Sequence, residues 1–219
     1  MGNKSEDLNI QIQYKLIEEL KKTNEDLQLK IKDEQAIGNK LKSTVAHLNL
    51  VNEFAQLIQK ANNTSDIVWA ITENAISKLG FEDCVIYLIN EEDNNLIQVA
   101  AYGHKNPNSR EIFNPVKIKI GEGIVGTVAK TGISEIISNT KKDSRYIVDD
   151  IPRLSEITVP IIYNEKVIGV IDSEHSKENF YNQNHLKILT TIGAMAGTKI
   201  IQAQLNENLI NHQKDLELI

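Results

Sequence analysis

The 219-residue chain has a single cysteine, Cys84. One thiol can form neither an internal disulfide nor a thiolate-rich metal site, and free cysteines are most often small buried hydrophobes. We therefore expect Cys84 to lie in a core. The five histidines are scattered along the chain, with no pair at ligand spacing on one helix face, so no metal site is predicted.

The sequence also lacks an excess of basic residues, because 24 Lys and Arg stand against 30 Asp and Glu, for a formal net charge of -6. Polyanion recognition requires a basic surface, so this composition argues against nucleic-acid binding. No apolar run approaches the roughly 20 residues that span a bilayer, and the N-terminal residues include no apolar stretch that could serve as a signal peptide. We expect a cytoplasmic protein without a membrane partner.

Proline and glycine are scarce in the first third of the chain. All four prolines lie between residues 107 and 160, and Gly38 is the only glycine or proline from Asn3 to Leu79. Since these residues are the strongest breakers of regular structure, the first third should be helical and the middle should hold the turns. The sequence predicts a coiled-coil helix over 1–47, a globular domain over 48–204 and a C-terminal helix extension over 205–219.

Aliphatic residues follow a heptad spacing through the N-terminal third. With Ile10 at position a, eight of the twelve a and d positions up to residue 48 are aliphatic. β-Branched residues at a and leucine at d favour a parallel two-stranded coiled coil, and one buried asparagine at a, here Asn24, fixes its register. Glu34 at d and Gly38 at a interrupt the seam. The expected dimer contacts are Ile17, Leu20, Asn24, Leu27, Ile31, Leu41, Val45 and Leu48.

A monomeric helix folded back on the domain is the alternative to a dimer. At 1.5 Å per residue, about 45 residues reach on the order of 70 Å, which is too long to bury one face on a small domain. This length favours a homodimer through a parallel coiled coil. The e and g positions lack the strong alternation of Glu and Lys that sets partner choice, so a heterodimer stays open.

The spacing of apolar residues changes after a second helical segment that closes at Gly80. The β-rich runs 84–89 and 96–102 flank a polar connector of hairpin length, which predicts an antiparallel pair. The runs 156–163 and 166–173 flank a two-residue link, which predicts a second hairpin. A long helical pattern then begins at 182. This order indicates an α+β domain with one antiparallel sheet flanked by helices.

Two blocks of the sequence carry a resemblance to a known family. They read KIKIGEGIVGTVAKTG over 117–132, and ITVPIIYNEKVIGVIDSEH over 157–175 with its sequel FYNQNHLKILTTIGAMAG. These blocks resemble a GAF domain, a sensory relative of the PAS fold, and the resemblance runs from about Leu48 to Gln204. It implies a GAF/PAS-like sheet with a cavity between the sheet and a layer of loops and a short helix. The glycines of GEGIVG would allow a tight turn and close packing of that helix.

The resemblance implies a signal-transduction input module rather than an enzyme. Such a domain binds a small molecule and transmits the change through dimeric helices, and this sequence is similar to GAF domains attached to bacterial sensor histidine kinases. The resemblance names neither the ligand nor a fixed cofactor. The candidate ligand contacts are polar residues on the strands and on the loop that would close the cavity: Tyr102, Arg145, Tyr146, Ser155, Glu156, Thr158 and Glu174. For Arg145 and Glu156, a purely structural role, each solvated or paired with another residue, stays open.

The specialised branches of the family can be compared with the residues present. Val85 rather than histidine follows Cys84, which argues against a covalent bilin, and NTKKDSRY over 139–146 departs from the NKxxF element of cyclic-nucleotide GAF domains. GEGIVG lacks the GKS/T ending of a phosphate loop. Methionine sulfoxide reductases of this fold depend on several cysteines, and one cysteine cannot resolve its own sulfenate. A dimerisation scaffold with a filled cavity is the main alternative to a sensor.

Overall fold

The computed structural model describes residues 3–106 and 110–217 and contains two compact units, Met1–Leu48 and Asn49–Ile219. The long helix α1 (Asn3–Lys60) fills the described part of the first unit and continues into the second. The long N-terminal helix expected from the scarcity of Gly and Pro is therefore confirmed. No helix in the described part of the chain combines the length and the hydrophobicity needed to cross a membrane.

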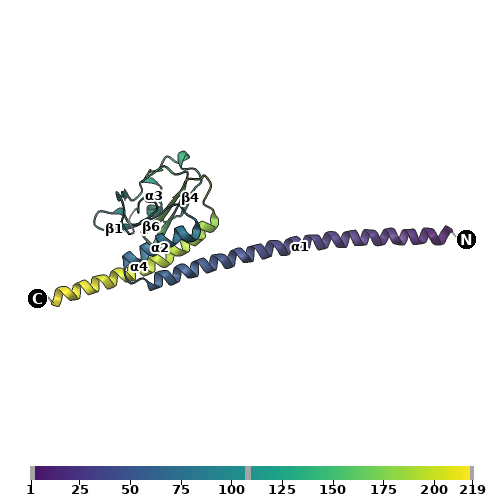
Figure 1. Cartoon of the computed structure of the whole chain (residues 1–219), viewed down its shortest axis with the longest axis horizontal. Helices are drawn as coiled ribbons and strands as arrows, with labels where there is room; N and C mark the ends of the chain where they lie inside the picture. The colour runs from purple at the N-terminus through teal and green to yellow at the C-terminus, as the bar shows by residue number, and fades with distance from the viewer. Residues whose placement is uncertain (1–2, 107–109, 218–219) are drawn as a thin grey trace. The chain divides into compact units, whose positions relative to one another are not determined.

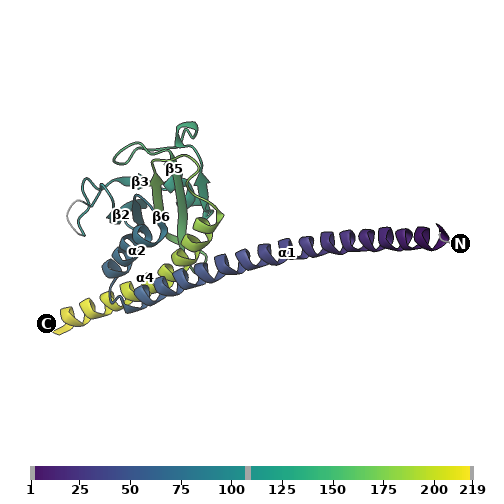
Figure 2. The ribbon, with the colours of Figure 1, turned by 45° about the vertical axis from the view of Figure 1, so that its right-hand side comes forward.

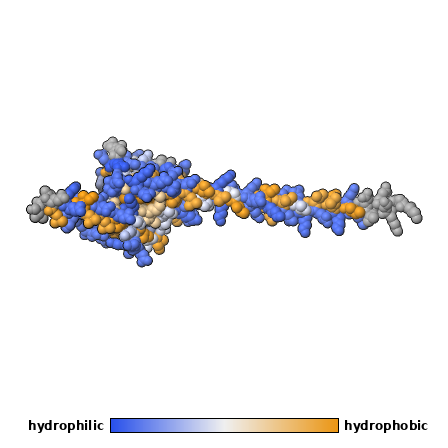
Figure 3. Space-filling model, turned by 90° about the horizontal axis from the view of Figure 1, so that it is seen from below, coloured by the Kyte–Doolittle hydropathy of each residue, from blue (hydrophilic) through white to orange (hydrophobic). Residues whose placement is uncertain are grey.

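The apolar side chains of α1 lie exposed on a single chain. Figure 3 shows them as orange patches along the helix, separated by hydrophilic surface. Every residue expected at the dimer contact is among the exposed positions, and Leu20 and Leu41 are about three-fifths exposed. Within its own unit, α1 thus exposes apolar side chains without a core to bury them.

One antiparallel sheet forms the centre of the second unit, as predicted. Its six strands run in the order β3-β2-β1-β6-β5-β4, so the two hairpins lie side by side through β1 and β6. In the second hairpin, Asn164 and Glu165 both have positive φ (46° and 64°), as a two-residue hairpin turn requires. The strands are β1 (Cys84–Asn90), β2 (Asn95–Tyr102), β3 (Lys117–Lys119), β4 (Glu135–Ile137), β5 (Ser155–Tyr163) and β6 (Lys166–His175).

Helices α2 (Thr64–Leu79) and α4 (Gln183–Glu217) cover one face of this sheet (Figures 1 and 2). The larger core lies between these two helices and the sheet. It includes Ile71, Ile157 and Leu189, together with Phe54 from the end of α1. Cys84 is fully buried in this core, as expected. Helix α4 packs closely on β5, because a Cβ on Gly197 would lie only 2.3 Å from the carbonyl oxygen of Ile162.

The opposite face of the sheet is covered by helix α3 (Gly123–Thr131) and by the segment that joins β4 to β5. This segment contains a short 3-10 helix, η1 (Thr140–Lys142). A smaller core lies here and includes Val85, Leu96 and Val170. Gly126 lets α3 approach the sheet as predicted, because a Cβ there would lie 2.4 Å from the carbonyl oxygen of Lys119. The functional site described below lies on this face.

Candidate functional site

Acidic side chains gather on the α3-covered face of the sheet. Alternate residues of a strand face the same side. Glu156 and Thr158 therefore project from β5 toward α3, and Asp172 and Glu174 project from β6 beside them. The strand register places Glu156 opposite Glu174 and Thr158 opposite Asp172. All four side chains are buried, and Asp83, just before β1, joins them. The fold thus concentrates carboxyl groups where water has little access.

Hydrogen bonds connect these groups to one another. The hydroxyl of Thr158 donates to Asp172 at 2.7 Å and lies 3.1 Å from Oε1 of Glu156. The hydroxyl of Tyr146 lies 3.3 Å from Oε2 of Glu174, and the Glu174 backbone N–H donates to Asp83. These contacts give hydrogen-bond partners to some of the carboxyl oxygens, but the donors are neutral hydroxyl and backbone N–H groups.

Burial strongly disfavours the charged forms of these groups. It raises the pKa of Asp172 to about 7, that of Asp83 to about 8 and that of Glu174 to about 10. Burial and the neighbouring Asp172 also raise the pKa of Glu156 well above its usual range. Several of these carboxyl groups therefore keep a proton at neutral pH. A positively charged group placed among them would stabilise the ionised forms instead.

Arg153 brings positive charge to one end of this cluster. Its guanidinium is buried, donates to Asp83 at 2.9 Å and lies 3.4 Å from Oδ2 of Asp150. Asp83, Asp150 and Glu174 hold carboxylate oxygens within 4.8 Å of one another, a spacing that a metal ion could use. Because Arg153 already pairs with two of these three residues, a cation is built into that position by the chain itself.

The space enclosed by the cluster is small. A cavity of about 20 Å³ lies between the sheet, α3 and the loop that joins η1 to β5, called the closing loop below. A neighbouring cavity measures about 10 Å³. A void of this size holds at most about one water molecule. The larger one is lined by four acidic residues among mostly apolar neighbours: Asp149, Glu156, Asp172 and Glu174 with Tyr87, Ile118, Val125 and Ile147 among others. A ligand must therefore displace side chains of the closing loop to enter.

The structure brings together five of the seven candidate ligand contacts. Glu156, Thr158 and Glu174 belong to the cluster, and Tyr146 contacts it through Glu174. Tyr102 lines the smaller void.

The other two candidates lie away from the cavity. Arg145 forms ion pairs with Glu135 and Asp143 near the surface. Ser155 faces away from the cluster and donates to the carbonyl oxygen of Lys177, because it is one position out of phase with Glu156.

Sequence reasoning missed several residues of the site. Asp172 carried a usable signal, because it precedes Glu174 by two positions in the same strand and must share its face. The others come from loops whose course over the sheet no local pattern reveals: Asp83, Lys105, Asp149, Asp150 and Arg153.

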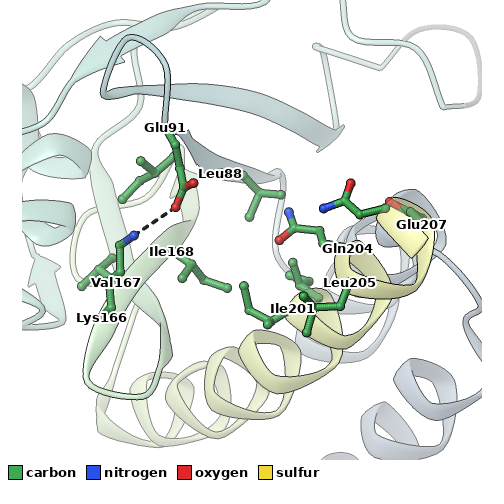
Figure 4. A pocket seen from close by; sticks show the side chains of 12 residues that line it. Leu88, Glu91, Lys166, Val167, Ile168, Ile201, Gln204, Leu205 and Glu207 are labelled. Atoms are coloured by element: carbon green, nitrogen blue, oxygen red, sulfur yellow. Dashed lines mark hydrogen bonds and ion pairs between the residues drawn. The ribbon is translucent and has the colours of Figure 1, made fainter. Parts of the chain in front are cut away.

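Larger hollows lie at the surface of the same unit. A groove of about 440 Å³ separates the C-terminal half of α4 from the ends of β1 and β6, and Figure 4 shows its apolar floor of Leu88, Ile168 and Ile201. At its edge, Lys166 donates to Glu91 at 3.0 Å. Both of these side chains are mostly exposed. The groove therefore lacks the buried polar groups that define the acidic cavity.

Cys84 cannot serve the acidic cavity. It lies on β1 with its side chain in the core beneath α2 and α4, on the other face of the sheet. Burial and the neighbouring Asp83 raise the pKa of its thiol well above the usual range. The thiolate is the reactive form of cysteine, so this side chain is poorly suited to nucleophilic or redox chemistry.

Comparison with known proteins agrees with this architecture. Over 56 residues the chain is 43% identical to a free methionine-R-sulfoxide reductase of Saccharomyces cerevisiae, covering 25% of this chain and 31% of the yeast protein. Over 75 residues it is 32% identical to protein YtsP of Bacillus subtilis, covering 34% of this chain and 46% of that protein. The chain thus matches less than half of the length of either relative.

A solved structure shows the same fold at low sequence identity. The GAF domain of a phosphoenolpyruvate-protein phosphotransferase from Acinetobacter superposes with a TM-score of 0.65 at 21% identity, covering 72% of this chain and 94% of that domain. The sequence model of the GAF domain family matches residues 61–200. Since this match spans more than half of the chain, the protein belongs to the GAF domain family of sensory and regulatory modules.

Proposed function

We propose that this protein is a sensory input module whose GAF domain binds a small molecule bearing a positively charged group. The observation that carries the proposal is the buried cluster of Glu156, Asp172 and Glu174, whose pKa values are all raised by burial. Buried charges are stable only when they are paired. A ligand cation would supply the partner that these carboxyl groups lack, and charge-assisted hydrogen bonds in a dry site would offset the cost of ionising them.

Transmission in this proposal runs through β6 to the start of α4. Ser173 and His175 lie on the opposite face of β6 from the cavity residue Glu174. The hydroxyl of Ser173 lies 2.8 Å from that of Tyr181, and the ring of His175 stacks on Phe180 with centroids 3.5 Å apart. A shift of β6 on ligand binding would therefore move the residues that lead into α4.

The same proposal includes a second copy of the chain. The exposed heptad seam of α1 supports a parallel homodimer, and ligand binding would bias the packing of its helices toward one of two arrangements. The output is a partner or further domain such as a histidine kinase, and the location is the cytoplasm. The exposed apolar residues of α1 support the dimer, membership of a sensory and regulatory family supports an output partner, and the composition of the sequence supports the cytoplasmic location.

A thermal-shift screen tests the ligand class. Small amines and guanidines would be compared with uncharged isosteres of the same size on the wild type and on Asp172→Asn/Glu174→Gln. We expect some cations to raise the Tm of the wild type in a saturable way, their isosteres to have no effect, and the double variant to lose the response. If every cation acts no more strongly than its isostere, the proposed ligand class is wrong.

A non-sensing scaffold is the second candidate, and the small size of the cavity favours it. In that case the acidic cluster would be a structural feature, and no compound would produce a saturable shift that depends on Asp172 and Glu174. The yeast relative raises methionine sulfoxide reduction as a third activity. We infer that this chain does not catalyse it, because its one thiol is buried on the other face of the sheet. A reductase assay that remains blank supports this inference.

A further inference from the structure

A lysine lies buried beside the acidic cavity. Lys105 follows β2, and its side chain is only 5% exposed. Its ammonium donates to the carbonyl oxygen of Asn114 at 2.9 Å and lies 3.4 Å from Oε1 of Gln98. A buried ammonium is stable only beside a counter-charge. The position of Lys105 therefore defines a place where the fold requires an anion.

The side-chain amide of Gln98 adds a second donor beside Lys105, and its orientation is fixed. Its Oε1 accepts from the backbone N–H of Val116 at 2.9 Å. Because a backbone N–H can only donate, the Nε2 group must point the other way. There it lies 2.9 Å from the hydroxyl of Tyr87 and donates to Asp149 at 2.6 Å. An ammonium and an amide N–H thus converge on one carboxylate.

That carboxylate belongs to the loop that closes the cavity. Asp149 lies between η1 and β5, whereas Gln98 lies in β2 and Lys105 in the turn after it. One oxygen of Asp149 lies 2.5 Å from the Lys105 ammonium, and the other accepts from Gln98. Ile147 of the same loop lines the cavity and packs against Gly123. The loop therefore fills, with its own side chains, the space that a ligand would need.

We propose that Lys105 and Gln98 form an anion subsite of the ligand cavity and that Asp149 is its internal occupant. A carboxylate of the ligand takes the place of Asp149 when the closing loop moves. Asp149 lines the same cavity as Glu156, Asp172 and Glu174, so this ligand carries a carboxylate beside its positive group. The inference that the ligand carries both charges rests on the proposed function. The subsite itself rests only on contacts within the chain.

Chemical rescue tests the subsite without a cationic ligand. Asp149→Ala removes the counter-charge of Lys105, and we expect its Tm to fall by on the order of 5–10 °C. Sodium formate, which matches the carboxylate group that is removed, should then raise the Tm of this variant in a saturable way, beyond the effect of sodium chloride at equal ionic strength. Formate should act on the wild type no more than chloride does, because Asp149 already occupies the subsite.

The double variant Lys105→Met/Asp149→Ala identifies the group that binds formate. We expect it to lose the rescue, and Glu91→Ala, which removes an exposed carboxylate, to show none. If Asp149→Ala does not fold, Asp149→Ser, which also lacks the charge and is smaller than Asp, serves in the same titration. Rescue that is absent, or that persists without Lys105, overturns the subsite. Neither result alters the outcome of the cation screen, so the two proposals fail separately.

Discussion

Burial of Asp172 makes its ionisation a cost to the folded state. Its pKa is raised to about 7 from an ordinary value of 3.8, so between about pH 4 and pH 7 the folded protein binds the proton more tightly than the unfolded chain does. The contribution of this group to stability is full below pH 4 and is lost as the pH rises through 7. The neutral amide of Asn avoids this loss and can still accept from Thr158.

We therefore expect Asp172→Asn to exceed the wild type in unfolding free energy at pH 8 by roughly 1–3 kcal/mol. Urea titrations across pH 4–8 would measure the difference, which should vanish near pH 4. His175 and His185, whose pKa values are lowered by burial, contribute with the opposite sign but equally in both proteins. A constant difference across this range would contradict the assignment.

Two arginines form similar ion pairs at different depths, and they should differ in their contribution to stability. Arg153 is buried against Asp83 and Asp150, whereas Arg145 is about one-third exposed against Glu135 and Asp143.

Removing one partner of a buried pair leaves an unpaired charge. We therefore expect Arg153→Met to lower the unfolding free energy by roughly 3–5 kcal/mol, and Arg145→Met by at most about 1 kcal/mol. Urea denaturation would measure both. Equal losses would show that Arg153 is not the main counter-charge of the cluster.

At the scale of elements, close packing of α4 on β5 depends on the absence of a side chain at Gly197. A Cβ there would lie 2.3 Å from the backbone oxygen of Ile162, which cannot move without disturbing the sheet. We expect Gly197→Ala to destabilise the domain by roughly 1–3 kcal/mol, measured by urea denaturation.

Gly38→Ala is the matched control. It lies in α1 with nothing within 4 Å of its added Cβ, and it should stabilise that helix by up to about 1 kcal/mol. Helix content followed by circular dichroism would show the gain. A gain at both positions would indicate that helix propensity rather than packing decides the outcome.

Most elements of the fold were predictable because their signals are local. The turn at Asn164-Glu165 and the apolar alternation on either side fixed the second hairpin, and the scarcity of Gly and Pro fixed α1. The junction of the hairpins through β1 and β6 was not predicted. It joins residues more than eighty positions apart, such as Val85 and Asp172, and no local spacing encodes such a pairing.

The site was less predictable than the fold. Glu156, Thr158 and Glu174 are candidates because they are polar residues on strands, and strand alternation places all three on the cavity face. No local pattern marks Lys105 and Arg153 as buried, since their burial depends on where two loops cross the sheet. The same reasoning explains Ser155: its polarity suggested the cavity, but its phase in β5 directs it to the opposite face.

At the scale of the whole molecule, the proposed homodimer is tested by substitutions at the predicted a and d positions of α1. Leu27 is exposed on a single chain at a predicted d position. We expect Leu27→Lys to convert the dimer to a monomer in sedimentation velocity, because it places two charges in the core of the coiled coil. Leu29→Lys, a change at an exposed position outside the a and d set, should remain dimeric. A wild type that sediments as a monomer would contradict the dimer.

Native mass spectrometry tests most directly the claim that the acidic cavity binds a positively charged small molecule. The wild type and Asp172→Asn/Glu174→Gln would be measured as purified and after incubation with the cations of the thermal-shift screen. We expect a non-covalent adduct of a cationic compound on the wild type that is lost from the double variant. Absence of any adduct across the panel, or an adduct retained equally by both proteins, would contradict it.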